Sequence, residues 1–250
     1  MSPVAVAAVQ PPSYPARPLN GGPLELAPPK PGQWGYEPKY NGWRALVHAP
    51  TGSMFNRYGQ PLSIAGKFGR ALERLRAAVV RVNGRTVEWF DCEALDRRHA
   101  LGRGTLLVFD YLTVGGVAGE SWRQRKELLA QSFPEHDYRE APLPEALYGV
   151  PGHDPGALKP QELYRQLRQW NGRWGCPFYE GVVAKRITDA YPVQLRSPHE
   201  AFVGWVKHRW AGSGGDRSGT LKPKPGRSAR ACPAMDRPTQ STPPLKILSL

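Results

Sequence analysis

The sequence predicts one folded domain that mixes strands and helices and is richer in strands. The chain has 250 residues, of which 40% are apolar and 10% aromatic, enough to close a hydrophobic core. Regular hydrophobic patterning is confined to a segment of about 190 residues, a usual size for a single domain. Within that segment, short apolar or alternating runs outnumber the longer runs with helical periodicity.

Both ends of the chain lack that patterning. Residues 1–21 are rich in Pro, Ala and Gly, and we expect them to form a disordered leader. Residues 213–250 contain no aromatic residue and several Lys and Arg, and we expect them to form a disordered basic tail. The domain itself is expected to occupy residues 22–212.

Seven segments are predicted to be strands because they are short, apolar or alternating, and rich in β-branched and aromatic residues. In chain order they are Trp34–Lys39, Arg44–His48, Ser53–Asn56, Thr86–Leu95, Leu106–Leu112, Glu180–Lys185 and Phe202–Lys207. Two segments, Ile64–Val80 and Gln161–Trp170, place their apolar residues on one helical stripe and are predicted to be helices.

Charged residues occur in or beside these apolar strands. They are Glu37, Lys39, Arg44, Glu93, Asp110, Glu180, Lys185 and Lys207. A charge in such a segment must be solvated, paired or functional. Because the set contains both signs, it predicts a shared polar cleft between sheets.

Composition also limits the class of partner and the compartment. The formal net charge is +13 and the pI about 9.9, which favours a polyanionic partner. Cys92, Cys176 and Cys232 have no paired spacing, so neither a disulfide framework nor a zinc site is predicted. No run is long enough to span a membrane and no signal peptide is recognisable, so we expect a cytoplasmic protein without a membrane partner.

The segment 37–44 (EPKYNGWR) is the most informative in the chain. On its own, Asn41-Gly42 between aromatic residues predicts a hairpin turn, with Lys39 and Arg44 as solvated strand ends. A functional interpretation needs support from other segments.

Six segments, in order along about 175 residues, supply that support. Residues 39–44 (KYNGWR) resemble a K-x-D-G-x-R motif, with Glu37 two residues before the lysine, and 56–59 (NRYG) resemble S-R-N-G. Residues 91–95 (DCEAL) resemble D-G-E-L, and 108–112 (VFDYL) resemble a further apolar and acidic motif. Residues 180–185 (EGVVAK) are similar to E-G-V-V-x-K, and 205–209 (WVKHR) to W-x-K-x-K.

Together these segments resemble the nucleotidyltransferase motifs of the ATP-dependent DNA ligase family. The resemblance implies the nucleotidyltransferase fold of the ligase adenylation domain. This is an ATP-grasp-like α+β fold with two antiparallel sheets, flanking helices and an ATP cleft between the sheets. A weaker similarity covers Arg123, Arg125 and Leu128, where the family has an Arg before a helix.

The resemblance also implies roles for individual residues. Lys39 would attack the α-phosphate of ATP and form a covalent lysyl-AMP, a step that needs a deprotonated amine and nearby cations such as Arg44, Lys185 and Lys207. Lys207 and Arg209 would contact the α-phosphate and stabilise the charge that builds on it. A basic strand edge is the alternative for Lys207 and Arg209.

Carboxylates and an aromatic ring complete the expected ATP site. Glu180 would hold Mg²⁺ or Mn²⁺, and Glu93 would lie near the ribose and the metal, with a structural ion pair as its alternative. Phe109 would stack on adenine unless it is a plain core residue. Glu37 would read the adenine edge, and Arg44 and Arg57 would contact the ribose or pyrophosphate. Nicked or broken duplex DNA would be the acceptor.

Two departures from the family pattern keep other functions open. Asn41 stands where the family has Asp, and the residues after Arg209 do not predict the OB-fold domain of complete DNA ligases. A separate OB-fold or DNA-repair subunit is therefore a candidate partner. The alternatives are an RNA ligase or mRNA-capping guanylyltransferase, and a non-catalytic DNA-binding relative.

Overall fold

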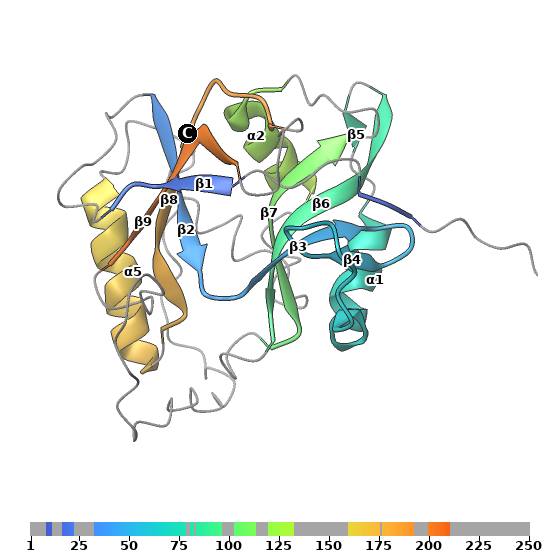
Figure 1. Ribbon diagram of the computed structural model, residues 1–250, viewed down its shortest axis with the longest axis horizontal. Coiled ribbons are helices and arrows are strands. Elements are labelled where there is room, and N and C mark those ends of the chain that lie inside the picture. The colour runs from blue at the N-terminus through green and yellow to red at the C-terminus, as the bar shows by residue number, and fades with distance from the viewer. Residues whose placement is uncertain are drawn as a thin grey trace, which may run out of the picture.

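The chain forms two β-sheets that stand side by side, each covered by helix (Figure 1). The computed structural model describes residues 9–11, 17–22, 33–78, 81–82, 84–96, 103–113, 120–132, 160–175, 177–192 and 200–210. The predicted tail at 213–250 and two of the three cysteines lie outside these ranges. Cys92 is a buried free thiol.

The first sheet has four strands in the order β1-β9-β8-β2. Their bounds are β1 Arg17–Asn20, β2 Trp34–Tyr40, β8 Tyr179–Arg186 and β9 Ala201–Arg209. The pairs β2–β8 and β8–β9 are antiparallel, whereas β1 pairs with β9 in parallel. At this edge the first sheet departs from the predicted antiparallel pairing.

The second sheet has five strands, ordered β4-β3-β6-β5 with β7 also paired to β6. Its strands are β3 Trp43–His48, β4 Ser53–Phe55, β5 Arg81–Val82, β6 Arg85–Leu95 and β7 Thr105–Thr113. All of its pairings are antiparallel. The seven predicted strands all exist, and their ends lie within one or two residues of the predicted ones.

Helices cover the two sheets separately. The predicted helix 64–80 is a 3₁₀ turn, η1 (Ala65–Phe68), followed by α1 (Gly69–Ala77), which buries Ala71, Leu72 and Leu75 in the core of the second sheet. The predicted helix 161–170 is α5 (Pro160–Trp174), which packs on β8 and β2 of the first sheet. Pro160 at its first position has no N–H to satisfy, and Glu162 complements the positive end of the helix dipole.

A further helix, α2 (Trp122–Ser132), packs against β7 and was predicted only as the helix expected after Arg123. Its N-terminus is tied to the residues after β8, because the backbone N–H groups of Trp122 and Arg123 donate to the carbonyls of Asp189 and Ile187 at 2.9 and 3.3 Å. Trp122 and Leu129 are buried. No described helix is long and apolar enough to cross a membrane.

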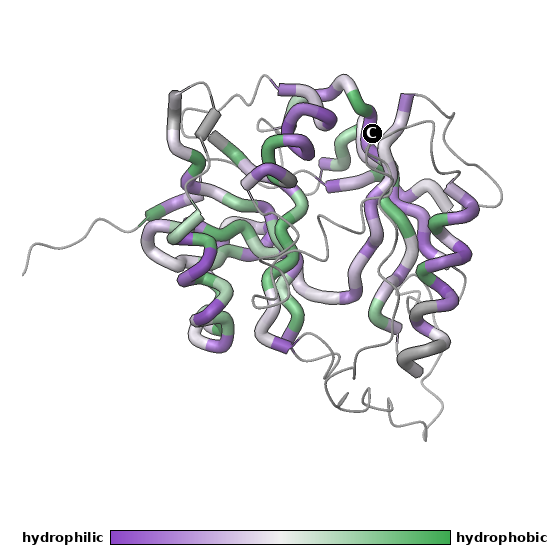
Figure 2. Tube along the Cα trace, turned by 180° about the vertical axis from the view of Figure 1, so that it is seen from behind, coloured by the Kyte–Doolittle hydropathy of each residue, from purple (hydrophilic) through white to green (hydrophobic). Residues whose placement is uncertain are grey.

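The hydrophobic core has two clusters, each centred on one sheet and extended by a few residues of the other. One cluster joins the second sheet to α1 and includes Leu46, Phe68, Phe90 and Tyr111. The other joins the first sheet to α5 and includes residues such as Tyr36 and Leu167. Along α5, hydrophobic and hydrophilic residues alternate with the turn of the helix, as an amphipathic helix on a sheet requires (Figure 2). Charged side chains from both sheets meet between them, beside aromatic ones such as Phe109 and Trp205.

Two predictions about local structure are wrong. β1 lies inside residues 1–21, which were expected to be a disordered leader, because its partner β9 supplies the pairing. Asn41-Gly42 does not close a hairpin among the described strands, because β2 pairs with β8 whereas β3 pairs with β4 and β6. The turn instead carries the chain from the first sheet to the second.

Candidate functional site

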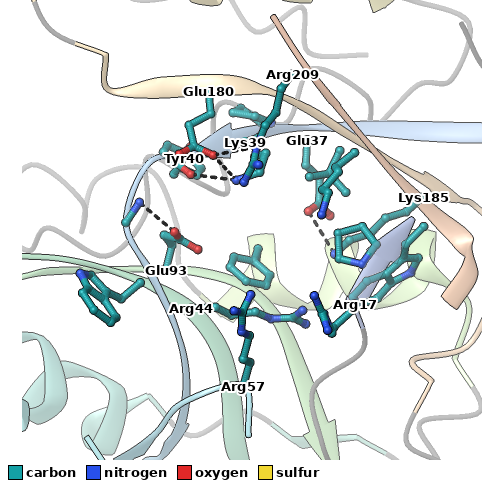
Figure 3. Close-up of a pocket in the computed structure, with 18 of the residues that line it drawn as sticks. Arg17, Glu37, Lys39, Tyr40, Arg44, Arg57, Glu93, Glu180, Lys185 and Arg209 are labelled. Carbon is teal, nitrogen blue, oxygen red and sulfur yellow. Dashed lines mark hydrogen bonds and ion pairs between the residues drawn. The ribbon is translucent and has the colours of Figure 1, made fainter. Parts of the chain in front are cut away.

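The two sheets enclose a pocket of about 400 Å³ (Figure 3). All ten residues predicted for the site line it. They are Glu37, Lys39, Arg44, Arg57, Glu93, Phe109, Glu180, Lys185, Lys207 and Arg209. The first sheet contributes residues from β2, β8 and β9, and the second contributes residues from β3, β6, β7 and the turn after β4. The polar cleft between sheets that the charged strand residues predicted is therefore present.

Lys39 lies near the end of β2 and is directed at Glu180 on β8. Its Nζ is 2.5 Å from Glu180 Oε2, and the two side chains are 17% and 9% exposed. The register of β2 and β8 skips Glu180, since Lys39 pairs with Gly181 and Tyr40 with Tyr179. Glu180 is thus the extra residue of a β-bulge, a feature that re-aims a side chain. The bulge turns Glu180 toward Lys39.

Arg209 and Lys207 on β9 add positive charge around that pair. Arg209 Nε lies 3.2 Å from the same Glu180 oxygen that Lys39 contacts. Burial, together with the neighbouring cations Arg209, Lys39 and Arg17, lowers the pKa of Lys207 to about 8. Several cations close together disfavour the protonated form of a neighbouring lysine. The same positive potential favours the binding of an anion among them.

Arg44 is held rigidly on the opposite wall. Its Nε donates to Asp91 Oδ1 at 2.9 Å and its Nη2 to Asp91 Oδ2 at 2.5 Å, a bidentate arrangement. Tyr191 donates to the same carboxylate at 2.7 Å. The guanidinium of Arg44 therefore has a fixed place in the pocket before any ligand arrives.

Phe109 on β7 is a partly exposed ring in the pocket wall rather than a plain core residue. Arg44 lies 5.6 Å from its ring centroid and Lys185 lies 5.3 Å from it. Cations near an aromatic face are attracted by its quadrupole. The ring is therefore an apolar platform between fixed charges, which suits a flat heteroaromatic base.

Glu37 lines the pocket, is buried, and is engaged by three donors. Oε1 accepts from the indole N–H of Trp122 and from Lys126 Nζ, both at 2.7 Å, and Oε2 lies 3.0 Å from Lys185 Nζ. Burial raises its pKa, but the nearby Lys126 and Lys185 lower it more, and the net direction is downward. Glu37 is thus an ionised anchor inside the protein, and contacts to an adenine edge would add to these bonds.

The network of buried ion pairs around Glu37 continues through Asp110, which is also buried. Arg125 donates to it from Nε at 2.7 Å and from Nη2 at 3.3 Å, and Lys185 Nζ lies 3.4 Å away. Burial raises the pKa of Asp110, but the adjacent Arg125 and Lys185 outweigh it and hold that pKa well below its usual range. Lys185 therefore connects two buried carboxylates to the pocket.

The sequence did not identify Trp122 and Lys126 as parts of the site, and indicated Arg125 only weakly. All three lie on one face of α2 at helical spacing of three and four residues. That spacing alone could not have identified them, because the complete burial of the Arg and the Lys is visible only in the structure. Lys126 Nζ also donates to the backbone carbonyl of Phe109 and so ties α2 to the platform.

Glu93 on β6 is the second carboxylate that faces Lys39. Its Oε1 accepts the backbone N–H of Gly42 at 2.8 Å. Its pKa is raised to about 7, because burial and the negative charge of Glu180 outweigh the opposite effects of Lys39, Gly42 and Arg44. Glu93 therefore lies within the electrostatic reach of Glu180, and both carboxylates line the pocket.

Glu93 and Glu180 fit a magnesium site of the kind that uses a nucleotide's phosphates. The described residues contain no group of three or more His, Cys, Asp or Glu that could hold a metal. Mg²⁺, however, is usually bound by one or two carboxylates together with substrate phosphates and water. The carboxylate pair in the pocket matches that pattern.

Arg57 reaches the pocket from a tight turn after β4. Asn56 Oδ1 accepts the backbone N–H groups of Tyr58 and Gln60 at 2.8 and 3.1 Å, which fixes the turn. Arg57 lies 4.9 Å from the centroid of the Tyr58 ring. Asn56 therefore has a structural reason to stand where the family motif has Ser.

Asn41 also has a structural role. Its Nδ2 donates to the carbonyl of Pro177 at 3.0 Å, and its backbone N–H donates to the carbonyl of Phe178 at 3.0 Å. An aspartate could not donate to Pro177. Asn41 fastens the crossing between the sheets to the residues before β8, and it is not among the described residues that line the pocket.

The chain was compared with known proteins. No protein-family model matches it. No curated protein matches it. Among solved structures, the ligase domain of LigD from M. tuberculosis is 21% identical, over 79% of this chain and 59% of that chain, with a TM-score of 0.49. A structure described as Pmar-Lig_Pre is 17% identical, over 79% and 47%, with a TM-score of 0.50. The Chlorella virus DNA ligase-adenylate is 15% identical, over 79% and 69%, with a TM-score of 0.47.

The TM-score of 0.50 shows a shared fold, and at 17% identity it shows the fold alone. The predicted α+β fold of the ligase adenylation domain is thereby confirmed. The chain spans less than two thirds of the length of the LigD ligase domain structure and of Pmar-Lig_Pre.

Proposed function

We propose that this protein is an ATP-dependent DNA ligase that forms a covalent adenylate on Lys39. The observation that carries the proposal is the pocket itself. Six segments that resemble ligase motifs, separated by up to about 160 residues, contribute side chains to one cavity, with Lys39 Nζ paired to Glu180 within it.

The first step is an in-line displacement at the α-phosphorus of ATP. A bond forms between Lys39 Nζ and the phosphorus, and the bond from phosphorus to the pyrophosphate oxygen breaks. The ammonium gives up one proton before the attack, for which Glu180 Oε2 is the acceptor at 2.5 Å. The nitrogen loses a second proton, to the departing pyrophosphate, as the bond to phosphorus forms. The products are lysyl-AMP and pyrophosphate.

The surrounding cations stabilise the charge that builds on the phosphate. Lys207 and Arg209 on β9 flank Lys39, and fixed cations in a site with little water act without reorganising at the moment of reaction. Glu93 and Glu180 would hold Mg²⁺, which supplies further neutralisation of phosphate charge when it is bound. Phe109 would take the adenine ring on its exposed face.

The acceptor of the AMP would be a DNA 5′-phosphate, followed by phosphodiester closure in the repair of nicked or broken duplexes. The net charge of +13 supports a polyanionic acceptor. The S-R-N-G-like turn at Arg57 and the W-x-K-x-K-like strand at Lys207 favour DNA over an RNA-ligase or capping substrate. A separate OB-fold subunit is a candidate partner for the later steps.

The decisive experiment is intact-protein mass spectrometry after incubation with ATP and Mg²⁺. We expect an AMP-sized adduct with ATP, none with Lys39→Ala, and none of GMP size with GTP. A GMP adduct would favour a capping enzyme. Absence of any adduct, with salt-sensitive DNA binding retained, would identify a non-catalytic DNA-binding relative instead.

A further inference from the structure

Arg17 on β1 lines the pocket, although it belongs to no motif and lies where the sequence predicted a disordered leader. We propose that Arg17 binds the β- and γ-phosphates of ATP and the pyrophosphate that leaves. The inference rests on the proposed nucleotide site and assigns it a residue that distinguishes a triphosphate from a monophosphate.

The position of Arg17 is fixed by the docking of β1 on β9. Arg17 and Pro18 pair with Ala201 and Phe202, and after a register shift Asn20 pairs with Lys207. The backbone N–H of Gly21 donates to the carbonyl of Lys207 at 3.0 Å. β1 is thus attached to the strand that carries Lys207 and Arg209.

Gly21 allows this close attachment. A Cβ at that position would lie 2.4 Å from Val206 Cγ1 and 2.5 Å from His208 Cε1, which is closer than side chains pack. The next residue, Gly22, has its carbonyl oxygen 3.1 Å from His208 Nδ1. The residues just after β1, Gly21 and Gly22, therefore both contact β9. Arg17 is the first residue of the short strand that leads to them.

The cations of the pocket form two groups. Lys39 and Arg209 lie together with Glu180, whereas the guanidinium groups of Arg17, Arg44 and Arg57 gather on the other side (Figure 3). Arg17 comes from the first sheet and Arg57 from the second, so the pair faces the pocket from both walls. An arginine fork can bind phosphate oxygens through two N–H groups at once.

The direction of the reaction connects these two groups. In an in-line displacement, the leaving oxygen lies on the far side of the α-phosphorus from the attacking atom. With Lys39 Nζ as the attacking atom, the pyrophosphate extends away from Lys39 and Glu180. The negatively charged pyrophosphate therefore lies near the group of arginines on the other side of the pocket.

The charge balance supports the same assignment. Among the described residues that line the pocket, seven are Lys or Arg and three are Glu. Part of this excess of positive charge is already neutralised by carboxylates outside the pocket lining, because Arg44 is paired to Asp91 and Lys185 to Asp110. Arg17 adds a cation from a strand outside all six motifs, and Lys207 feels its charge. The single phosphate of AMP would neutralise little of this positive charge.

The test compares binding of ATP and AMP in a background that cannot react. In Lys39→Ala protein with Mg²⁺, calorimetry gives the dissociation constants of both nucleotides, with and without Arg17→Gln. We expect Arg17→Gln to weaken ATP binding roughly tenfold or more, as loss of a charge-assisted hydrogen bond does, and to change AMP binding by less than about twofold. Arg17→Lys, which keeps the charge but loses the fork, should fall between.

Arg70→Gln, at an exposed position on α1 outside the pocket, is the matched control and should leave both constants unchanged. Thermal unfolding of each variant shows whether β1 and the domain remain folded. Equal weakening of ATP and AMP, or no change in either, would overturn the assignment of Arg17. So would a failure of the Lys39→Ala protein to bind ATP at all.

The two proposals can fail separately. An ATP-specific effect of Arg17→Gln, in a protein whose unmodified form makes no adduct with ATP, would retain the triphosphate site and reject the covalent chemistry. An adduct that forms equally well in Arg17→Gln at low ATP concentration would retain the chemistry and reject the role of Arg17.

Discussion

Lys39 Nζ and Glu180 Oε2 lie 2.5 Å apart although 141 residues separate them in the chain. The pair exists because β2 and β8 are antiparallel neighbours and because the bulge at Glu180 turns its carboxylate toward Lys39. The most reactive group of the proposed mechanism is therefore positioned by a local irregularity in a sheet. The first two predictions concern that irregularity.

Replacing Glu180 with Gln should slow adduct formation by about 100-fold or more, the usual loss when a charged contact to the reacting groups is removed. The substitution removes the proton acceptor of Lys39, the partner of Arg209 and a candidate metal ligand in one step. Single-turnover adenylation followed by mass spectrometry measures the effect. Glu73→Gln, at an exposed position on α1, is the control, and an unchanged rate in Glu180→Gln would contradict the mechanism.

Replacing Gly181 with Ala should destabilise the protein and impair adenylation together. Gly181 has φ of 151°, and a Cβ there would lie 1.9 Å from the carbonyl oxygen of His208 on β9. The backbone would have to move, and we expect a loss of about 2 kcal/mol or more in the free energy of unfolding. Urea denaturation measures it.

Gly66→Ala is the matched control for that experiment. Gly66 lies in η1, and no atom comes within 4 Å of an added Cβ. Its effect on the free energy of unfolding should be near zero or slightly favourable, because alanine has less freedom to lose in a helical turn. Similar losses in both variants would show that the bulge does not require glycine.

The stability of the protein should depend on pH through Glu93. Its folded-state pKa is raised to about 7 from its ordinary value of 4.5, so between those pH values the folded state holds a proton that the unfolded chain has already released. The contribution of Glu93 to stability is thus present below about pH 4.5 and is lost as the pH rises through about 7.

Glu93→Gln should remove that dependence while it keeps an acceptor for the Gly42 N–H. Urea denaturation at about pH 5 and about pH 8 should show that wild type loses stability relative to the variant on going to the higher pH. A difference between the two proteins that stays constant with pH would show that Glu93 is ionised throughout.

Removing Arg125 should cost more than removing its partner with it. Arg125 and Asp110 are both fully buried and joined by two hydrogen bonds. Arg125→Met leaves Asp110 charged without its main partner and should cost about 3–5 kcal/mol, whereas Arg125→Met with Asp110→Asn should cost less than the sum of the single changes. Additive losses in a double-mutant cycle would mean that the two side chains act independently.

The sequence predicted the strands of the site well because each carries its own alternation and its own motif. It could not predict β1, since Arg17–Asn20 is too short and polar to indicate a strand and its pairing partner β9 begins at Ala201. The Asn41-Gly42 turn was misinterpreted for a related reason. A local turn signal does not reveal that the strands on either side of it pair with β8 and β6 rather than with each other.

The buried ion pairs between α2 and the pocket residues could not be predicted from the sequence either. α2 buries Arg125 and Lys126 on the face that packs toward Glu37 and Asp110, so hydrophobic periodicity gave no sign of which face is inside. Only the structure brings these charges opposite one another. The sequence identified the residues that belong to a motif. It did not identify the residues that hold those motif residues in place.

The buried charges below the pocket constrain how this protein can change over generations. Glu37 and Asp110 share Lys185, Glu37 also holds Lys126, and Asp110 also holds Arg125. Loss of any one of the five leaves a neighbour charged and poorly solvated at a cost of several kcal/mol, which a marginally stable domain cannot easily absorb. We therefore expect these positions to covary among descendants of this sequence, with a carboxylate and its basic partners replaced together.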